Sequence, residues 1–502
     1  MKLTNRFFLT LAIALTAILQ VSAQTFDGYA LYNEQNQNTT YLVDENGDIA
    51  HSWSCNTSCN YTVQLKEDGN LVRGGVYSGN QLTGAAIGGI IQEYDKDGNV
   101  VWEFIYSSSS YCQHHDLTIM PNGNVLFVAW EVKSTAELTQ AGYDNATSEK
   151  WPPHIVEIKP DGNGGADIVW EWHLWDHMIQ DHDNTKDNYG VIADHPELMD
   201  VNAITSGARP GRGGDWFHCN GIDYNEDLDQ IVVTSRYASE LFIIDHSTTT
   251  AEAASHSGGN SNMGGDLIYR WGNPSNYDHS GTQVFSGAVH DPRWIKEGRP
   301  YAGYIQVFNN VGGSGGSSVV DAIKPPLNGY NYDYTKGEAY APASYTLRHE
   351  CVDDADGQSA SDRMTNGNIF VNLSREYMYE ADSNGKVIWQ YNASPAKAFR
   401  YECAYDGVKA LLGSAACTPT GIAEPQANGI EVFPNPSAGN FNIQGQTTDE
   451  IESIVVYDIL GNQLYSTNML QIDLSAYQNG MYVFKMYMKN EQVLTKQVSL
   501  LR

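Results

Sequence analysis

Short apolar segments recur along the chain, and several of them begin directly after a turn of the type Asp-Gly-Asn or Asn-Gly-Asn. The stretches 67–72, 121–126 and 365–370 each place such a turn before an apolar run. Asn-Gly and Asp-Gly pairs supply the positive φ that two-residue hairpin turns need. The runs behind them are rich in the Val, Ile, Leu and Phe typical of strands. The pattern predicts a succession of antiparallel hairpins.

A second repeated element is an acidic turn followed by a strand that ends in tryptophan. It is clearest at 95–102 and 382–389, with looser copies ending at Trp53, Trp170 and Trp271. We expect the tryptophans at these strand ends to pack between neighbouring modules, because a large aromatic ring buries much apolar surface.

Together the two elements repeat at about 60 to 90 residues, which corresponds to a four-stranded blade with long loops. About six such modules fit between Phe26 and Cys417. The sequence therefore predicts an all-β fold, a β-propeller that is most consistent with six blades. We expect the strands between Tyr29 and Trp53 to complete the last blade near Tyr401 to Asp406 and so close the ring.

Histidines stand at the head of three of these modules, in 111–116, 215–220 and 287–292. Equivalent positions of successive blades face a common axis, so their imidazoles are expected to meet in one pocket. Histidine there can act as a nucleophile, a general base or a metal ligand. Zinc needs three or four such ligands, but the short His pairs that often accompany zinc are missing. No phosphate-binding loop is present either, so we predict neither a metal nor a cofactor.

The acidic composition argues against nucleic acid as a binding partner. The net charge is −31 and the pI is about 4.6, and such a surface repels nucleic acid. The acidic turn 44–48 resembles a calcium loop but lacks its full spacing and its terminal glutamate. A structural calcium ion remains an alternative.

The N-terminus has the features of an export signal. Lys2 and Arg6 precede an apolar run from 7 to 19 and a small-residue cleavage site at 21–23. We expect a signal peptide at 1–23 and no membrane span in the mature protein, since no second apolar run of that length follows.

Export places seven cysteines in an oxidising compartment. Cys55 and Cys59 are close enough for a local disulfide, which we favour over a metal site because no histidine lies at ligand spacing beside them.

Beyond Cys417 the residue pattern becomes that of a linker at 418–428, and a strand-rich segment follows at 429–502. The stretches 432–441, 455–461 and 474–482 follow one another in an order that closely resembles the C-terminal sorting domain of type IX secretion in Bacteroidetes. The resemblance implies a small β-sandwich that engages the type IX machinery, passage through the periplasm and across the outer membrane, and release or attachment at the cell surface.

The segment 24–417 resembles the bacterial arylsulfate sulfotransferases. The similarity rests on 215–224 with 231–236, on 114–116 before 120–124, and on His290-Asp291 with 308–312 downstream. It implies transfer of a sulfuryl group from a phenolic sulfate ester to a phenol through a sulfohistidine, without the nucleotide donor PAPS.

By motif, His218 and His290 correspond to active-site histidines of that family. Arg236 is a candidate to stabilise oxyanions, His115 is a third candidate, and His349 is the candidate from the later blades.

One departure from the family motif supports an alternative function. The family commonly carries an arginine shortly after the strand that ends near Asn310, whereas 312–318 contains only glycine and serine. The alternative is a non-catalytic surface propeller that binds a glycan, a peptide or a cation.

Overall fold

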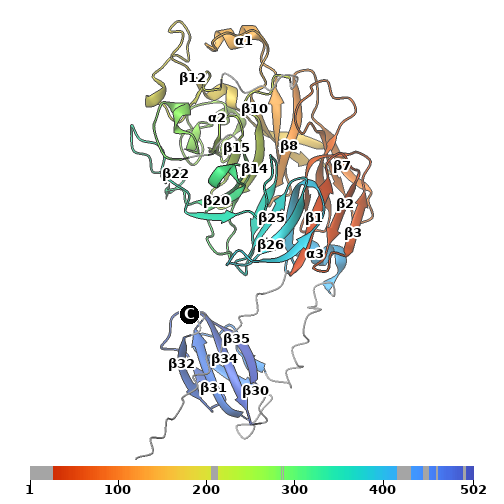
Figure 1. Cartoon of the computed structure of the whole chain (residues 1–502), viewed down its shortest axis with the longest axis vertical. Coiled ribbons are helices and arrows are strands. Elements are labelled where there is room, and N and C mark those ends of the chain that lie inside the picture. Colours follow the sequence, from red (N-terminus) through yellow and green to blue (C-terminus); the bar gives the residue numbers. More distant parts are fainter. Residues whose placement is uncertain are drawn as a thin grey trace, which may run out of the picture. The chain divides into compact units, whose positions relative to one another are not determined.

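The repeated hairpins form six four-stranded antiparallel sheets in the computed structural model of the chain (Figure 1). The structure describes residues 27–204, 213–283, 285, 288–414, 431–444, 451–458, 462–489 and 493–502. The predicted signal peptide and linker lie outside these ranges. The chain divides into two compact units, Met1–Cys417 and Thr418–Arg502.

The six sheets are the blades of a propeller, numbered here from the N-terminus and each given from its innermost to its outermost strand. Blade 1 consists of β28 (Pro395–Glu402), β1 (Gly28–Glu34), β2 (Thr39–Val43) and β3 (Ile49–Ser54). Blade 2 consists of β4 (Cys59–Leu65), β5 (Leu71–Val76), β6 (Gly89–Tyr94) and β7 (Val100–Ile105). Blade 3 consists of β8 (Tyr111–Ile119), β9 (Val125–Glu131), β10 (Pro153–Pro160) and β11 (Ala166–His173). Blade 4 consists of β14 (Cys219–Asn225), β15 (Gln230–Ser235), β16 (Glu240–Asp245) and β17 (Leu267–Trp271). Blade 5 consists of β18 (Val289–Trp294), β19 (Ile305–Asn309), β20 (Val319–Ile323) and β23 (Leu347–Glu350). Blade 6 consists of β24 (Ala360–Arg363), β25 (Ile369–Leu373), β26 (Tyr377–Ala381) and β27 (Val387–Tyr391). The innermost strands contact one another in the cyclic order β28, β4, β8, β14, β18, β24.

The ring closes where the sequence predicts. Strand β1 pairs antiparallel with β28, with Tyr29 opposite Tyr401, so the first blade contains both ends of the propeller. A ring closed by strands from its two ends has no exposed sheet edge at the junction.

The predicted packing of the strand-end tryptophans between blades is confirmed, since each of them clusters with apolar residues of the following blade. The indole N–H groups of Trp53, Trp170, Trp271 and Trp389 each donate a hydrogen bond to a group of the following blade or its insertion. Trp102 instead donates to Glu93 of its own blade. Their rings are buried, so these side chains combine apolar packing with a polar contact across the blade interface.

Helices and short strands occupy the connections. The helices are α1 (Thr135–Gln140), α2 (Thr250–Ala253) and α3 (Asp406–Leu412), with short 3₁₀ turns η1 (Leu174–His177), η2 (Ile192–Asp194), η3 (Pro274–Tyr277) and η4 (Ser314–Gly316). The short strand pairs are β12 (Met178–Ile179) with β13 (Met199–Asp200), and β21 (Leu327–Asn328) with β22 (Asn331–Tyr332).

The C-terminal unit is a sandwich of two sheets. Its strands are β29 (Glu431–Phe433), β30 (Asn440–Gln444), β31 (Ile451–Asp458), β32 (Gln463–Thr467), β33 (Gln471–Asp473), β34 (Gly480–Met488) and β35 (Val493–Leu500). One sheet has the order β29-β30-β33 and the other β32-β31-β34-β35. Alternating side chains such as Phe441, Ile454, Phe484 and Val498 form the core of this unit, as expected for strands with one buried face.

The disulfide expected between Cys55 and Cys59 is not formed. Both residues are buried free thiols in the structure, and burial raises the pKa of Cys59. The sulfur of Cys55 lies near the carbonyl of Trp53, and that of Cys59 near the carbonyl of Thr62. Each thiol therefore contacts a nearby backbone carbonyl rather than the other sulfur.

The acidic turn 44–48 is a hydrogen-bonded loop in which a carboxylate oxygen of Asp44 accepts from the backbone of Asn46 and Asp48. This geometry explains the aspartate at position 44 through local hydrogen bonding. Among the described residues, no helix has both the length and the apolar character needed to cross a bilayer.

A buried lysine joins three blades at the propeller axis. Lys397 of β28 contacts Asp116 of β8 at 2.6 Å and Asp291 of β18 at 2.7 Å, and all three side chains are almost completely buried. Burial raises the pKa of Asp116. For Asp291, burial is outweighed by Arg293 and Lys397, so its pKa is lowered.

Replacing Lys397 by methionine should destabilise the propeller by about 3 to 5 kcal/mol, because removal of one partner leaves buried charge uncompensated. Urea unfolding of Lys397→Met against wild type measures the change. Lys409→Met is the matched control, since Lys409 and its partner Asp406 are exposed and such pairs contribute less than about 1 kcal/mol. Equal urea midpoints for Lys397→Met and Lys409→Met would contradict a stabilising role for the contacts of Lys397 with Asp116 and Asp291.

Candidate active site

The innermost strands share a backbone irregularity at the positions of the histidines. His115 has φ +47°, His218 +52°, Asp291 +52° and, in blade 6, Gln358 +57°. The pairing registers of β8, β14 and β18 shift at the same places. Such bulges insert residues that have no cross-strand partner and re-aim the side chains beside them.

The structure brings His115 and His218 together at this end of the strands. Their ring centroids are 4.7 Å apart and the rings meet edge to face. His115 also packs against the ring of Tyr61 at 5.3 Å, and His218 against Tyr237 at 4.9 Å. The predicted meeting of imidazoles from separate blades is therefore present for these two.

His218 is oriented by a carboxylate. Its Nδ1–H donates to Oδ2 of Asp215 at 2.5 Å, and the other oxygen of Asp215 accepts from the indole of Trp130 at 3.0 Å. Both His218 and Asp215 are buried. A carboxylate that holds Nδ1–H leaves the lone pair on Nε2, which is the arrangement used to orient a nucleophilic or basic histidine.

His290 belongs to the same cluster but is more tightly satisfied. Its Nδ1–H donates to Oδ1 of Asn310 at 2.6 Å, while its Nε2 accepts from the backbone N–H of Gln358 at 3.1 Å. The amide of Asn310 donates in turn to the carbonyl of Ala355, which fixes Oδ1 as the acceptor. Burial, with Arg236 second, lowers the pKa of His290 to about 3.

His114 and His115 form a pair of neutral imidazoles. Their Nδ1 atoms are 2.7 Å apart, so one nitrogen donates and the other accepts. His114 stacks on Trp130 with centroids 4.0 Å apart. Burial lowers the pKa of His114 to about 3 and that of His115 well below its ordinary value. Because a buried charge is costly, both rings stay neutral near pH 7.

Arg236 lies beside the histidines, as predicted. It follows β15, and its backbone N–H donates to the carbonyl of His218 at 3.1 Å. A Cβ atom on Gly357 would lie 3.1 Å from Nη1 of Arg236 and 3.9 Å from Cε1 of His290. The missing side chain at Gly357 therefore leaves room for the guanidinium next to His290. This cluster, His115, His218, His290 and Arg236, is called the axial cluster below.

His349 is not part of the axial cluster. It lies on β23, the outermost strand of blade 5, where its Nε2 is 2.9 Å from the hydroxyl of Tyr379. Its neighbour Arg348 is paired with Asp321 and does not supply the arginine missing from 312–318. The corresponding position of blade 6 carries Gln358 rather than a histidine.

Tyr61 is a site residue that the sequence reasoning missed. It lies in the bulged part of β4, between Cys59 and Val63, where the register shifts. Its buried hydroxyl has no hydrogen-bond partner among the described residues, and burial raises its pKa well above the ordinary value. The only signal was its position at the head of blade 2, where blades 3, 4 and 5 carry histidine.

A family model described as arylsulfotransferase (ASST) matches residues 7–325, and one described as a secretion system C-terminal sorting domain matches residues 431–499. No curated protein matches the chain. Blade 6 with Gln358 lies beyond the first match, and so does β28 of blade 1, which carries Lys397.

Similar solved structures share little sequence with the chain. A protein of unknown function from Bacteroides caccae is 12% identical, covering 74% of this chain and 98% of its own, with a TM-score of 0.41. The periplasmic gluconolactonase PpgL of Pseudomonas aeruginosa is 9% identical, covering 94% and 99%, with a TM-score of 0.38. Neither supports an argument about function.

The sorting domain is that of type IX secretion, so the chain is exported to the cell surface or secreted. The first match spans more than half of the chain and contains every member of the axial cluster. The chain therefore belongs to the arylsulfotransferase (ASST) family and carries a C-terminal type IX sorting domain.

Proposed function

We propose that the chain is an exported sulfotransferase that moves a sulfuryl group from a phenolic sulfate ester to a phenol, with His218 as the nucleophile. The observation that carries the proposal is the 2.5 Å hydrogen bond between Nδ1 of His218 and Asp215. It selects the tautomer whose Nε2 lone pair is available for attack. Among the three histidines of the axial cluster, only His218 has a ring nitrogen that is hydrogen-bonded to a carboxylate.

The first half-reaction forms a bond between Nε2 of His218 and sulfur. The sulfur–oxygen bond to the aryl group breaks, and its electron pair leaves on the phenolate oxygen. Positive charge develops on the imidazole, where Asp215 stabilises it. Negative charge on the sulfuryl and phenolate oxygens is stabilised by Arg236, because a guanidinium keeps its charge when buried.

The second half-reaction restores the enzyme. The oxygen of an acceptor phenol attacks the same sulfur, the nitrogen–sulfur bond breaks, and its electron pair returns to Nε2. The first phenolate takes a proton from water after it leaves, and the acceptor gives its proton to water. His115 and His290 are then neutral groups that position the reactants, since their lowered pKa values make them poor proton carriers near pH 7.

A non-catalytic propeller that binds a glycan, a peptide or a cation is the second candidate. Three observations favour it: Nε2 of His290 already accepts a backbone hydrogen bond, blade 6 has Gln358 in place of a histidine, and 312–318 has no arginine.

The assay that separates the candidates uses the purified chain with p-nitrophenyl sulfate and a phenol acceptor. We expect acceptor-dependent release of nitrophenolate, and a loss of at least about 10³-fold in His218→Ala because the nucleophile is removed. His182→Ala is the matched control, as His182 lies outside the axial cluster and is half exposed. No release by the wild type across phenolic sulfates would favour the binding propeller, and equal rates in His218→Ala would exclude this nucleophile.

Asp215→Asn tests the positioning of His218. An amide can present its N–H to Nδ1 and so stabilise the wrong tautomer, with an expected drop in kcat of about 10²- to 10⁴-fold. KM for the donor and the melting temperature should change little, because the side chain keeps its size and can still accept from Trp130. A fall in stability with unchanged kcat would instead show that Asp215 has a structural role only.

A further inference from the structure

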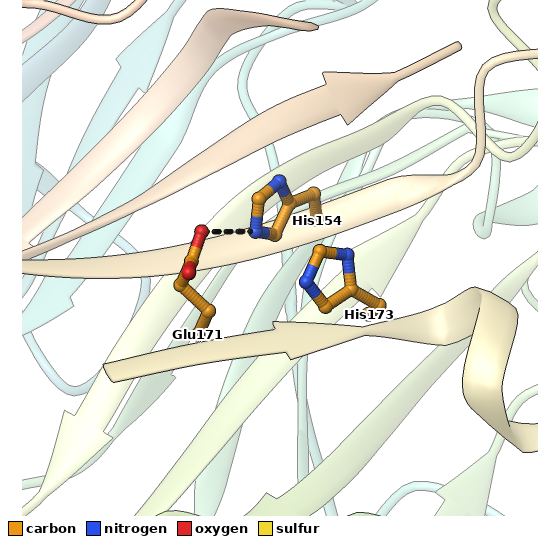
Figure 2. A group of neighbouring side chains, drawn as sticks. All are labelled: His154, Glu171 and His173. Carbon is orange, nitrogen blue, oxygen red and sulfur yellow. Dashed lines mark ion pairs between the residues drawn. The ribbon is translucent and has the colours of Figure 1, made fainter. Parts of the chain in front are cut away.

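A second group of histidines and carboxylates lies on the outer strands of blade 3. His154 of β10 stands directly opposite His173 of β11 in the antiparallel register. Glu171 precedes His173 by two residues, so its side chain emerges on the same face of β11. Figure 2 shows the three side chains converging from the two strands. Their proximity is set by strand pairing and does not depend on a loop.

The three residues offer ligand atoms at short range. One atom from each of His154, Glu171 and His173 lies within 4.8 Å of the other two. Nε2 of His154 is 3.2 Å from Oε1 of Glu171, and the two imidazoles are stacked with centroids 3.9 Å apart. Two imidazole nitrogens and one carboxylate are a ligand set that zinc and related divalent metals accept.

The Nδ1 atoms of both rings have polar neighbours. Nδ1 of His154 is 3.1 Å from the hydroxyl of Tyr106, and Nδ1 of His173 is 3.3 Å from Oε1 of Glu131. Lys133 contacts the other oxygen of Glu131 at 2.7 Å. Metal-binding histidines are characteristically oriented in this way, by a carboxylate or another polar group on the nitrogen that does not bind the metal. In both rings the remaining nitrogen is Nε2.

One of the ligand atoms has no hydrogen bond. Nε2 of His154 is buried and has no hydrogen-bond partner, since its approach to Glu171 has ion-pair distance but not hydrogen-bond geometry. Leaving such an atom unpaired costs about 1 to 3 kcal/mol, and a metal ion would remove that cost. The side chains of Glu171 and His173 are 31% and 29% exposed, which leaves an entry path and room for water.

The other comparable group among the described residues is less suitable. His177, His256 and Asp266 are also close together, but Nδ1 of His177 faces Asp266 and its Nε2 faces the carbonyl of Ala253. Both nitrogens of His177 are therefore occupied within the fold, and His256 is largely exposed.

We propose that His154, Glu171 and His173 form a binding site for one divalent transition metal ion, with Zn²⁺ as the best fit and water completing the coordination. Glu131 and Tyr106 orient the two imidazoles. The site joins β10 to β11 at the rim of blade 3. It is separate from the axial cluster, and it holds whether or not the chain transfers sulfuryl groups.

Isothermal titration calorimetry tests the site on the full chain after removal of metals with a chelator. We expect one Zn²⁺ per chain, and a melting temperature that rises with Zn²⁺ because the ion binds the folded state only. His173→Ala should weaken the affinity at least about 10²-fold, and Glu131→Gln about 10-fold or more. His256→Ala is the matched control and should bind as the wild type does.

The outcomes separate this site from adventitious binding. Absence of binding by the wild type overturns the proposal, as does full affinity in the triple variant of His154, Glu171 and His173 to alanine. Loss of binding in His256→Ala would move the site to the other group. Circular dichroism of each variant establishes that it is folded, and the absorption of bound Co²⁺ gives a second readout that reports nitrogen ligands directly.

Discussion

The ammonium group of Lys397 between Asp116 and Asp291 is the contact on which the centre of this propeller depends. It links the innermost strands of blades 1, 3 and 5 across the axis. Each aspartate directly follows a histidine of the axial cluster, His115 or His290. The ion triad therefore fixes the bulged segments of β8 and β18, and with them the directions of the two imidazoles. An enclosed charge network of this kind is costly unless every partner is present, so it also specifies how the ring must close.

Charge is distributed unevenly along the axis. The aspartates are neutralised by Lys397 and Arg293, whereas the histidines share their end with Arg236. Burial is the main reason that the lowered pKa values of His115 and His290 leave these imidazoles uncharged, and Arg236 adds to the effect at both. Arg236 beside the uncharged imidazoles of His115 and His290 fits the anionic ester of the proposed reaction. His218 differs from its neighbours because Asp215 accepts a hydrogen bond from its ring, and on this difference the proposed mechanism separates the attacking group from the positioning groups.

The outer strands serve other purposes than the inner ones. Their tryptophans join successive blades, and in blade 3 they also present His154, Glu171 and His173 on one face (Figure 2). Strand β9 links the two regions, since Trp130 stacks on His114 while Glu131, the next residue, faces His173. One strand thus supports the axial cluster with one side chain and the proposed metal site with the next.

Much of the architecture follows from local sequence. Asn-Gly and Asp-Gly turns, alternating strands and the strand-end tryptophans determined the propeller, its closure through the first strands and the sandwich after Cys417, because these features depend on short-range backbone and packing preferences. The histidine motifs also identified His115, His218 and His290, since equivalent positions of a closed ring face one axis.

Tertiary structure alone decided which side chains meet. His349 is of a residue type common in active sites, but it lies on an outermost strand. Tyr61 belongs to no recognisable motif, but it lies in a bulge beside the axis. The partners of Lys397 and the pairing of His154 with His173 join residues far apart in sequence or on different strands. Such contacts are set by ring closure and strand register, which no local pattern contains.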